Sequence, residues 1–358
     1  MAAAFDIRPG IESLPASAIV AVANHGRGRD RLIPLWFGEG DLPTPDFIGE
    51  AANRAIRDGH VFYTYQRGLP ELREALSRLL AQSHPVAEIL VVDDGSTDGT
   101  DSMVRTEFPS VRYVRLPHNA GLIYARNFGF VNTMGDYVLS VDDDSWFVEP
   151  DGLARAVAFL DSHVDVAAVA CNIETKDGLV YFPKAAAPFD APWYVGCGHL
   201  LRRSAVESVG LYMPELYRQG EEKDRCLRLL GAGYRVVALP DVMVFHDKSE
   251  KGRKPGLERF YNHRNDLIRE IARCPAGLLP WRFARSWIGN SWKNLRHGPR
   301  LTDLKVILAL PEIVRIGLKH RAPVGVEAYR RWLHLAATAA PGRVGGGERN
   351  RTMHPKTA

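Results

Sequence analysis

Three acidic clusters in a fixed order constrain this chain more than any other feature of its sequence. Two of them follow short apolar runs, in Val91-Val92-Asp93-Asp94-Gly95 and Ser140-Val141-Asp142-Asp143-Asp144, and the third is Gly220-Glu221-Glu222-Lys223-Asp224. A short apolar run is typical of a buried strand, and its carboxyl end then carries the aspartates. Ligands bind at that edge of open α/β sheets. Because crowded carboxylates repel one another, the clusters predict a bound cation with a phosphate-bearing ligand.

Composition separates an acidic part of the chain from a basic one. The 358 residues are 46% hydrophobic, enough for a large core and more than one folding unit. From residue 250 to the end, 22 Lys and Arg stand against 8 Asp and Glu, although the whole chain carries only +4. The four cysteines are irregularly spaced, which argues against a disulfide framework or a zinc site. No signal peptide or membrane-spanning run is found, so the sequence predicts a cytoplasmic protein.

Apolar runs alternate with helical patterns between residues 88 and 246, which predicts a mostly parallel α/β sheet flanked by helices. Four parts are expected: an N-terminal segment (1–59), the α/β domain (60–250), a basic amphipathic helical extension (251–335) and a disordered tail (336–358). Helices are expected near 46–58 and at 69–82. Strands are expected at 88–92, 111–115, 136–141, 166–173, 235–238 and 242–246.

Further motifs follow in a set order. Asn119-Ala120-Gly121 leads into Arg126-Asn127, a Gly-rich segment spans 196–203, and Val242-Met243-Val244-Phe245-His246 closes the domain. Together with the acidic clusters, these motifs resemble a family 2 glycosyltransferase of the GT-A fold, a Rossmann-like α/β fold, over about residues 78–330. The resemblance implies inverting transfer of a sugar from a nucleotide-diphosphate sugar to a glycan or lipid-linked acceptor, in polysaccharide and cell-envelope biosynthesis.

The resemblance also implies a donor site and a metal site. Mg²⁺ or Mn²⁺ would be held by Asp142, Asp144 and His246. A plain strand-to-helix turn remains an alternative for the first cluster, and a structural role remains one for His246. The implied nucleotide-sugar-binding residues are Asp93, Asp94, Ser96, Asp98, Asn119, Gly121, Arg126, Asp142 and Gly198.

The third cluster supplies the candidate catalytic residues Glu221, Glu222 and Asp224. In the family an acidic pair, usually Glu-Asp, deprotonates the acceptor hydroxyl. Here the pair is Glu221-Glu222, and Glu222 is the expected base, displaced by about one bond length. Favourable charge at a helix N-terminus is the alternative explanation. The segment Phe260–Asn265 resembles an aromatic-Arg-Asn stretch that these enzymes carry on the acceptor side.

The N-terminal segment resembles a different family. Residues 5–80, with Phe37-Gly38-Glu39-Gly40-Asp41 and His60–Ala75, are similar to the N-terminus of a class I pyridoxal-phosphate aminotransferase. Neither a cofactor domain nor a Schiff-base lysine follows, so no pyridoxal phosphate is expected. Residues 60–65 are predicted to replace the first strand of the glycosyltransferase. A catalytically impaired binding protein and an aminotransferase fragment are the alternative functions.

The basic extension combines cations with apolar faces, as in Leu301–Leu308 and Arg315–Lys319. Such a pattern is typical of helices on an anionic membrane surface, here the inner face of the cell membrane. Amphipathic helices packed on the α/β domain are the alternative. Nucleic acid is not expected as a partner, because no recognised motif accompanies the charge.

Overall fold

The computed structural model describes residues 70–176, 178–182, 187–248, 255–297 and 301–338, with a few isolated residues before residue 70. The chain divides into two units, residues 1–63 and 64–358, and all elements below belong to the second. The predicted strand at 60–65, most of the aminotransferase-like segment with the helix expected near 46–58, and most of the tail therefore lie outside the described residues.

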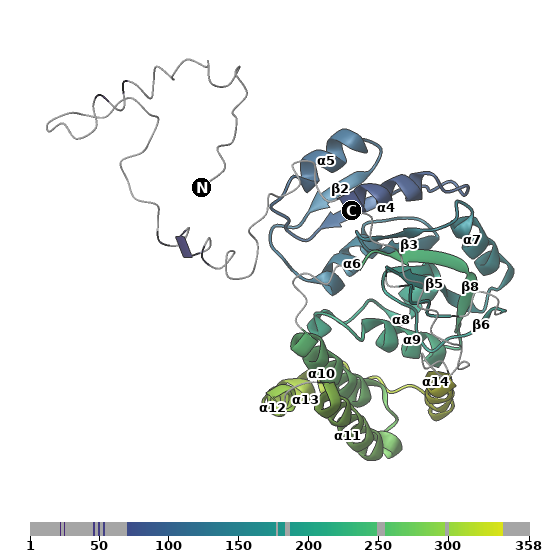
Figure 1. Cartoon of the computed structure of the whole chain (residues 1–358). Helices are drawn as coiled ribbons and strands as arrows, with labels where there is room; N and C mark the ends of the chain where they lie inside the picture. Colours follow the sequence, from purple (N-terminus) through teal and green to yellow (C-terminus); the bar gives the residue numbers. More distant parts are fainter. Residues whose placement is uncertain are drawn as a thin grey trace, which may run out of the picture. The chain divides into compact units, whose positions relative to one another are not determined.

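Two sheets form the core of the second unit (Figure 1). A small one pairs β1 (Leu90–Asp93) with β2 (Arg112–Arg115) in parallel. The larger one has the order β3-β7-β5-β8-β4, with β6 on β8. Its strands are β3 (Tyr137–Val141), β4 (Ser145–Phe147), β5 (Val166–Thr175), β6 (Phe189–Asp190), β7 (Gly198–Arg202) and β8 (Arg235–His246).

The expectation of a mostly parallel sheet needs correction. Among the described strands, only β1 with β2 and β5 with β8 pair in parallel, whereas β7 runs antiparallel between β3 and β5, and β4 and β6 run antiparallel to β8. Strands β4, β6 and β7 were not predicted, since β4 and β6 are very short and β7 begins with a polar, Gly-rich stretch. Strand β8 was predicted as two strands, 235–238 and 242–246, with Pro240 between them. A bulge accommodates this proline, and the Asn172 side-chain amide donates to the Pro240 carbonyl at 2.9 Å.

Strand β5 divides the core because successive side chains point to opposite faces of a sheet. Ala168 and Ala170 join one apolar cluster, and Val169 and Cys171 join the other. One face is covered by α7 (Gly152–Ser162), and the other by residues of α6, α8 and α9. The remaining helices of this part are α4 (Pro70–Leu80), α5 (Thr100–Glu107), α6 (Leu122–Val131), α8 (Arg203–Val209) and α9 (Glu221–Gly231).

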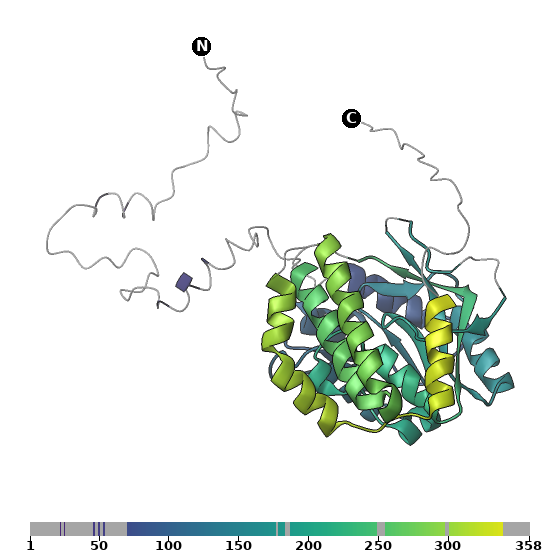
Figure 2. The ribbon, with the colours of Figure 1, turned by 90° about the horizontal axis from the view of Figure 1, so that it is seen from below.

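The predicted basic helical extension is observed, and its last helix runs to Thr338, slightly beyond the expected end (Figure 2). Helix α10 packs against α11, α12 and α13, and Gly317 of α13 lies so close to Ile271 that a Cβ would approach it to 2.6 Å. No helix among the described residues has the length and apolarity to cross a bilayer. The helices are α10 (Pro255–Arg273), α11 (Leu279–His297), α12 (Leu301–Leu308), α13 (Leu310–Lys319) and α14 (Val326–Thr338).

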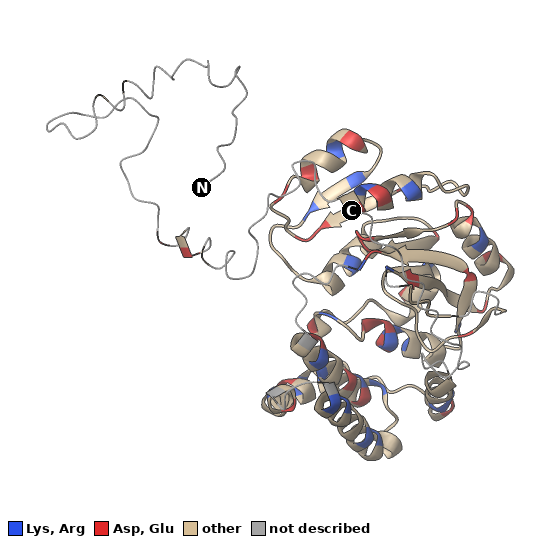
Figure 3. Ribbon diagram, in the orientation of Figure 1, with Lys and Arg blue, Asp and Glu red and all other residues tan. Residues whose placement is uncertain are grey.

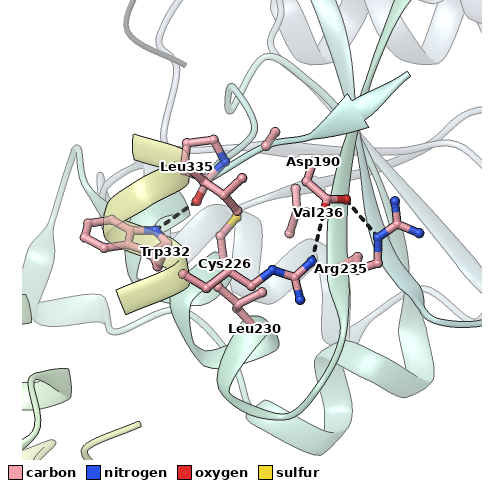
Figure 4. Close-up of a pocket in the computed structure, with 10 residues that line it drawn as sticks. Asp190, Cys226, Leu230, Arg235, Val236, Trp332 and Leu335 are labelled. Atoms are coloured by element: carbon pink, nitrogen blue, oxygen red, sulfur yellow. Dashed lines mark hydrogen bonds and ion pairs between the residues drawn. The ribbon is translucent and has the colours of Figure 1, made fainter. Parts of the chain in front are cut away.

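Helix α14 is fastened to the α/β domain by specific polar contacts (Figure 4). The Trp332 indole donates to the Pro192 carbonyl at 3.0 Å, and Asp190 pairs with Arg331 at 2.7 Å and Arg235 at 2.8 Å. The cavity that remains in this seam is about 10 Å³, so it holds at most a water molecule. This contact is packing, and it shows that part of the extension belongs structurally to the α/β domain.

Candidate active site

The first acidic cluster closes a turn at the end of β1. Asp93 is buried, and its carboxylate accepts hydrogen bonds from the Ser96 backbone N–H at 2.7 Å and from the Tyr113 hydroxyl on β2. Burial raises the pKa of Asp93, but the hydrogen bonds from Tyr113 and Ser96 outweigh it and lower that pKa overall. Asp93 is therefore a charged residue held within the protein.

Asp94 links the first motif to the second. Its two oxygens accept hydrogen bonds from the backbone N–H groups of Ala120, at 2.6 Å, and Gly121, at 2.9 Å. Gly121 has φ +91°, and a Cβ there would lie 2.9 Å from the Tyr217 ring. Both facts require glycine, because an L-residue would be strained and would clash. The turn that opens α6 is thus built jointly by Asp94, Gly121 and Tyr217.

Three other residues of the predicted donor site lie around this turn. Asp98 accepts a hydrogen bond from the Thr100 backbone N–H at 3.1 Å, at the start of α5, which agrees with the helix-turn alternative for this cluster. Asn119 is exposed, and Ser96 is partly buried. The side chains of Ser96 and Asn119 stay predicted ligand contacts.

Arg126 joins the second, third and fourth motifs. Its guanidinium donates to Asp142 Oδ1 at 2.7 Å and to Glu221 Oε1 at 2.9 Å, with only 10% of the side chain exposed. A Cβ on Gly196 would lie 2.5 Å from this guanidinium, so Gly196 leaves the room that Arg126 occupies. The sequence predicted Arg126 as a phosphate-binding cation, whereas here it is neutralised by two carboxylates. Its observed contacts order the site.

Glu221 and Glu222 begin α9, immediately after the left-handed Gly220. Glu221 is buried, and its Oε2 has no hydrogen-bond partner among the described residues. Burial and the neighbouring Glu222 raise the pKa of Glu221, and Arg126 opposes that rise. Glu222 is only partly buried. The environments of the two carboxyls therefore differ, as expected for one structural and one reacting group.

Asp224 does not join this constellation. It is buried between α9 and α10, where Arg273 pairs with it at 2.7 Å and Arg228 at 2.9 Å. These ion pairs keep the pKa of Asp224 low despite burial, which by itself raises it. Both of its oxygens are occupied, so the expectation that Asp224 is a catalytic residue is corrected to a structural ion pair.

Strand β4 brings Asp144 to His246. Ser145 pairs with His246 across β4 and β8, and Asp144 Oδ1 then lies 3.2 Å from His246 Nε2. Asp142, Cys197 and His246 each present one ligand atom, all within 4.8 Å of one another. Carboxylate oxygens and an imidazole suit a divalent cation such as Mg²⁺ or Mn²⁺. Asp142 and Asp144 thus each lie near His246, and the donor atoms of these three residues suit such an ion.

Cys197 was not predicted as part of this cluster. Its carbonyl accepts a hydrogen bond from Ser145 Oγ at 2.9 Å, and the same hydroxyl accepts one from the Asp142 backbone N–H at 2.8 Å. Burial raises the pKa of the Cys197 thiol, so it stays protonated at neutral pH. The adjacent Gly198 pairs with Val141 in the sheet, and a Cβ there would meet Ile173 at 2.8 Å. Gly198 therefore serves close packing of the strands beneath the cluster.

A strained loop precedes the acidic pair. Tyr217 and Gln219 have positive φ angles of 62° and 65°, which non-glycine residues seldom adopt. The Asn265 side-chain amide donates to the carbonyls of Leu216, Arg218 and Gln219 at 3.1, 2.8 and 2.7 Å. Arg264 donates to the Glu215 carbonyl at 3.2 Å. Arg264 and Asn265, which were expected near the acceptor, are buried and hold the loop that carries Tyr217 and Gln219.

Comparison with known proteins finds similar glycosyltransferases. Residues 41–210 match the model of glycosyl transferase family 2. An N-acetylglucosaminyl-diphospho-decaprenol L-rhamnosyltransferase of Mycobacterium tuberculosis is 28% identical over 257 residues, covering 58% of this chain and 82% of that protein. The chain spans only 12% of another relative, the glycosyltransferase GlyA of Streptococcus pneumoniae, at 41% identity.

Two further similarities concern the fold and the N-terminus. The crystal structure of S. aureus TarS residues 1–349 in complex with UDP-GlcNAc has a TM-score of 0.48 and 17% identity, covering 75% of this chain and 88% of that one. A probable aspartate/prephenate aminotransferase of Aquifex aeolicus is 41% identical over 73 residues, 20% of this chain and 18% of that protein.

The match of residues 41–210 agrees with the resemblance to a family 2 glycosyltransferase that the sequence predicts. The α/β fold and the helical extension expected from the sequence are confirmed. The short match to an aminotransferase agrees with the predicted resemblance of the N-terminal segment.

Proposed function

We propose that the protein is an inverting, metal-dependent glycosyltransferase that moves a sugar from a nucleotide-diphosphate sugar to a hydroxyl of a glycan or lipid-linked acceptor. The observation that carries the proposal is the Arg126 guanidinium, which joins Asp142 of the third motif to Glu221 of the fourth. This contact fixes the acidic helix start next to the predicted metal site. Such a constellation brings an acceptor base and a diphosphate site to one sheet edge.

Glu222 takes the acceptor proton in this proposal. The acceptor oxygen attacks the anomeric carbon as its O–H proton passes to Glu222, and the bond from that carbon to the diphosphate oxygen breaks. The nucleoside diphosphate leaves with the bonding electrons. Glu221, paired with Arg126, holds the start of α9 in place, so that the partly buried Glu222 carboxylate faces the acceptor.

Asp142, Asp144 and His246 would hold the Mg²⁺ or Mn²⁺. Such an ion offsets negative charge on a departing diphosphate. Asp94 positions the neighbouring turn through Ala120 and Gly121, where the second motif is expected to approach the diphosphate. The relative named as a rhamnosyltransferase for a decaprenol-linked substrate supports a lipid-linked acceptor and a role in cell-envelope polysaccharide synthesis.

A second candidate function, a binding protein with impaired catalysis, rests on the sheet topology. Among the described strands β1 pairs only with β2, and β3 pairs only with β7, so one edge of each has no partner there. The strand predicted at 60–65 lies outside the described residues. A donor site that lacks such a strand would have one wall fewer, and catalysis would be impaired.

A panel of nucleotide sugars tests the proposal. With Mn²⁺ present, one of dTDP-rhamnose, UDP-GlcNAc or GDP-mannose is expected to raise the melting temperature, since a ligand that binds the folded state stabilises it. Release of the nucleoside diphosphate from that donor is then measured. The binding-protein alternative predicts stabilisation without release, and no stabilisation by any donor, with or without metal, contradicts nucleotide-sugar binding.

Two variants separate the assigned roles. Glu222→Gln is expected to keep donor binding and to lower kcat about 100-fold or more, because only the base is lost. Asp144→Asn is expected to weaken the dependence on Mn²⁺ and donor binding together. Glu207→Gln, on the exposed side of α8, is the matched control and should behave as wild type. Full activity in Glu222→Gln would show that another group is the base.

A further inference from the structure

Helix α11 exposes an unusual surface. Its 19 residues contain no Asp or Glu, and they include Arg282, Arg285, Lys293 and Arg296. The apolar side chains Trp281, Ile288, Trp292 and Leu295 are all at least half exposed, at 68%, 67%, 58% and 50%. Their spacings of seven, four and three residues place them along one side of the helix. We call this set the α11 stripe.

Polar side chains on the buried side of the same helix have partners within the protein. Arg282 pairs with Glu270 at 3.1 Å, and Asn294 donates to Asp303 at 2.8 Å, so these residues anchor α11 to α10 and to the start of α12. The α11 stripe therefore lies on the side of the helix that does not pack against α10. Large apolar side chains exposed together on one helix mark an interaction surface.

A groove beside the stripe is open and polar. It has a volume of about 190 Å³ between α10 and α11, and its lining includes Arg269, Arg285, Asn290 and Lys293. The two carboxylates that line the groove already have partners within the protein. Asp266 pairs with Arg269 at 2.5 Å, and Glu270 accepts hydrogen bonds from Arg282 and from the Tyr329 hydroxyl. Arg285 and Lys293 pair with no carboxylate in the described part of the chain.

A partner that binds the α11 stripe and this groove must therefore offer both apolar and anionic groups. Tryptophans prefer the boundary between lipid tails and headgroups, and each nearby Lys or Arg strengthens the attraction to an anionic leaflet. Arg296 also lies over the Trp292 ring, 5.1 Å from its centroid, so charge and apolar surface lie side by side. Helix α12, which begins next to the end of α11, likewise exposes Leu304 and Leu308.

We propose that the α11 stripe lies in the interface of an anionic phospholipid bilayer, and that Arg285 and Lys293 at the rim of the adjoining groove bind lipid phosphates. The helix would lie flat in the headgroup region, with its tryptophans among the upper acyl chains. This inference stands on the extension alone and does not require that the domain transfers a sugar. If the acceptor is lipid-linked, the same surface holds the enzyme where the acceptor is found.

Co-sedimentation of the full chain with phosphatidylcholine vesicles, with and without phosphatidylglycerol, tests the proposal. Binding is expected only with phosphatidylglycerol, and it should weaken as salt is raised. The double variant Ile288→Ser/Trp292→Ser is expected to bind at least about tenfold more weakly, because the two apolar side chains no longer enter the bilayer. Arg285→Gln/Lys293→Gln should reduce the preference for the anionic lipid.

The control is the double variant Met134→Ser/Val164→Ser, which removes two apolar side chains that are 88% and 78% exposed on the α/β domain. It should bind vesicles like the wild type. Unchanged melting temperatures show that the stripe variant is folded. Equal binding by wild type and stripe variant, or no binding by wild type, overturns the proposal. A concentration-dependent dimer that the stripe variant abolishes would assign the surface to a second copy instead.

Discussion

Basic residues occur both in the α/β domain and along α11 (Figure 3), and they serve different purposes in these two regions. At the active-site edge, Arg126 is one-tenth exposed and lies between two carboxylates. On α11, Arg285 and Lys293 are exposed beside a groove whose carboxylates are paired with other residues. The same charge therefore orders a buried site in one region and is left for an external partner in the other. Burial and pairing distinguish a structural cation from a binding cation better than its position in a motif.

The largest expected effect is that of Arg126→Met. Removing one partner of a buried pair leaves Asp142 and Glu221 uncompensated, which costs about 3 to 5 kcal/mol of stability. Urea denaturation followed by circular dichroism measures the loss. Adding Glu221→Gln to the variant should restore part of it, since one uncompensated charge is then removed. Arg285→Met is the matched exposed control. If Arg126→Met loses no more stability than this control, the buried and exposed cations do not differ in their structural role.

A smaller effect is expected for Asn265→Ala. The substitution removes the amide that three loop carbonyls share, and lost hydrogen bonds of this kind cost about 1 to 3 kcal/mol. The loop carries the strained Tyr217 and Gln219 and leads directly to Glu221, so kcat should fall more than donor affinity. Stopped-time transfer assays and melting curves measure the two effects. If kcat is unchanged, the loop does not position the acidic pair.

The smallest expected effect concerns pH and the contact between the loop and α13. Glu215 is partly buried, which raises its pKa, but hydrogen bonds from Lys319 and His320 lower that pKa to about 2 from 4.5. A lowered folded-state pKa stabilises the protein above about pH 4.5, and this stability is lost as the pH falls toward about 2. Because the side chain is nearly one-quarter exposed, we expect a contribution of only about 1 kcal/mol.

Glu215→Gln tests this expectation. Melting temperatures of the variant and the wild type should differ most at neutral pH and converge under acid. Glu149→Gln, another partly buried glutamate, whose ion-pair distance to Arg155 is 3.9 Å, serves as a control with a weaker partner. A constant difference between Glu215→Gln and the wild type at every pH would mean that the carboxylate charge is not what stabilises the contact.

Much of the fold was predictable because local patterns agree with the tertiary structure. The apolar runs before Asp93 and Asp142 do form strands, and the helix predicted at 69–82 is observed at Pro70–Leu80. The direction of β7 and the existence of β4 were not predictable, since both depend on pairing with distant strands. The gathering of Asp142, Asp144 and His246 was expected, yet Cys197 and the pairing of Arg126 were not.

The sequence by itself determined the family resemblance of the domain, the order of its motifs and the separation of acidic from basic residues. Fold class and charge depend directly on residue types and on short-range periodicity, so these properties can be read from the sequence. Only the tertiary structure decided which charged side chains remain available to bind a ligand or to react. Asp224 and Arg126 each pair with a residue that is distant in the sequence, by 49 and 95 residues, and no local pattern encodes these two contacts. The three acidic clusters thus predicted a site, and packing selected the groups within it that are free to react.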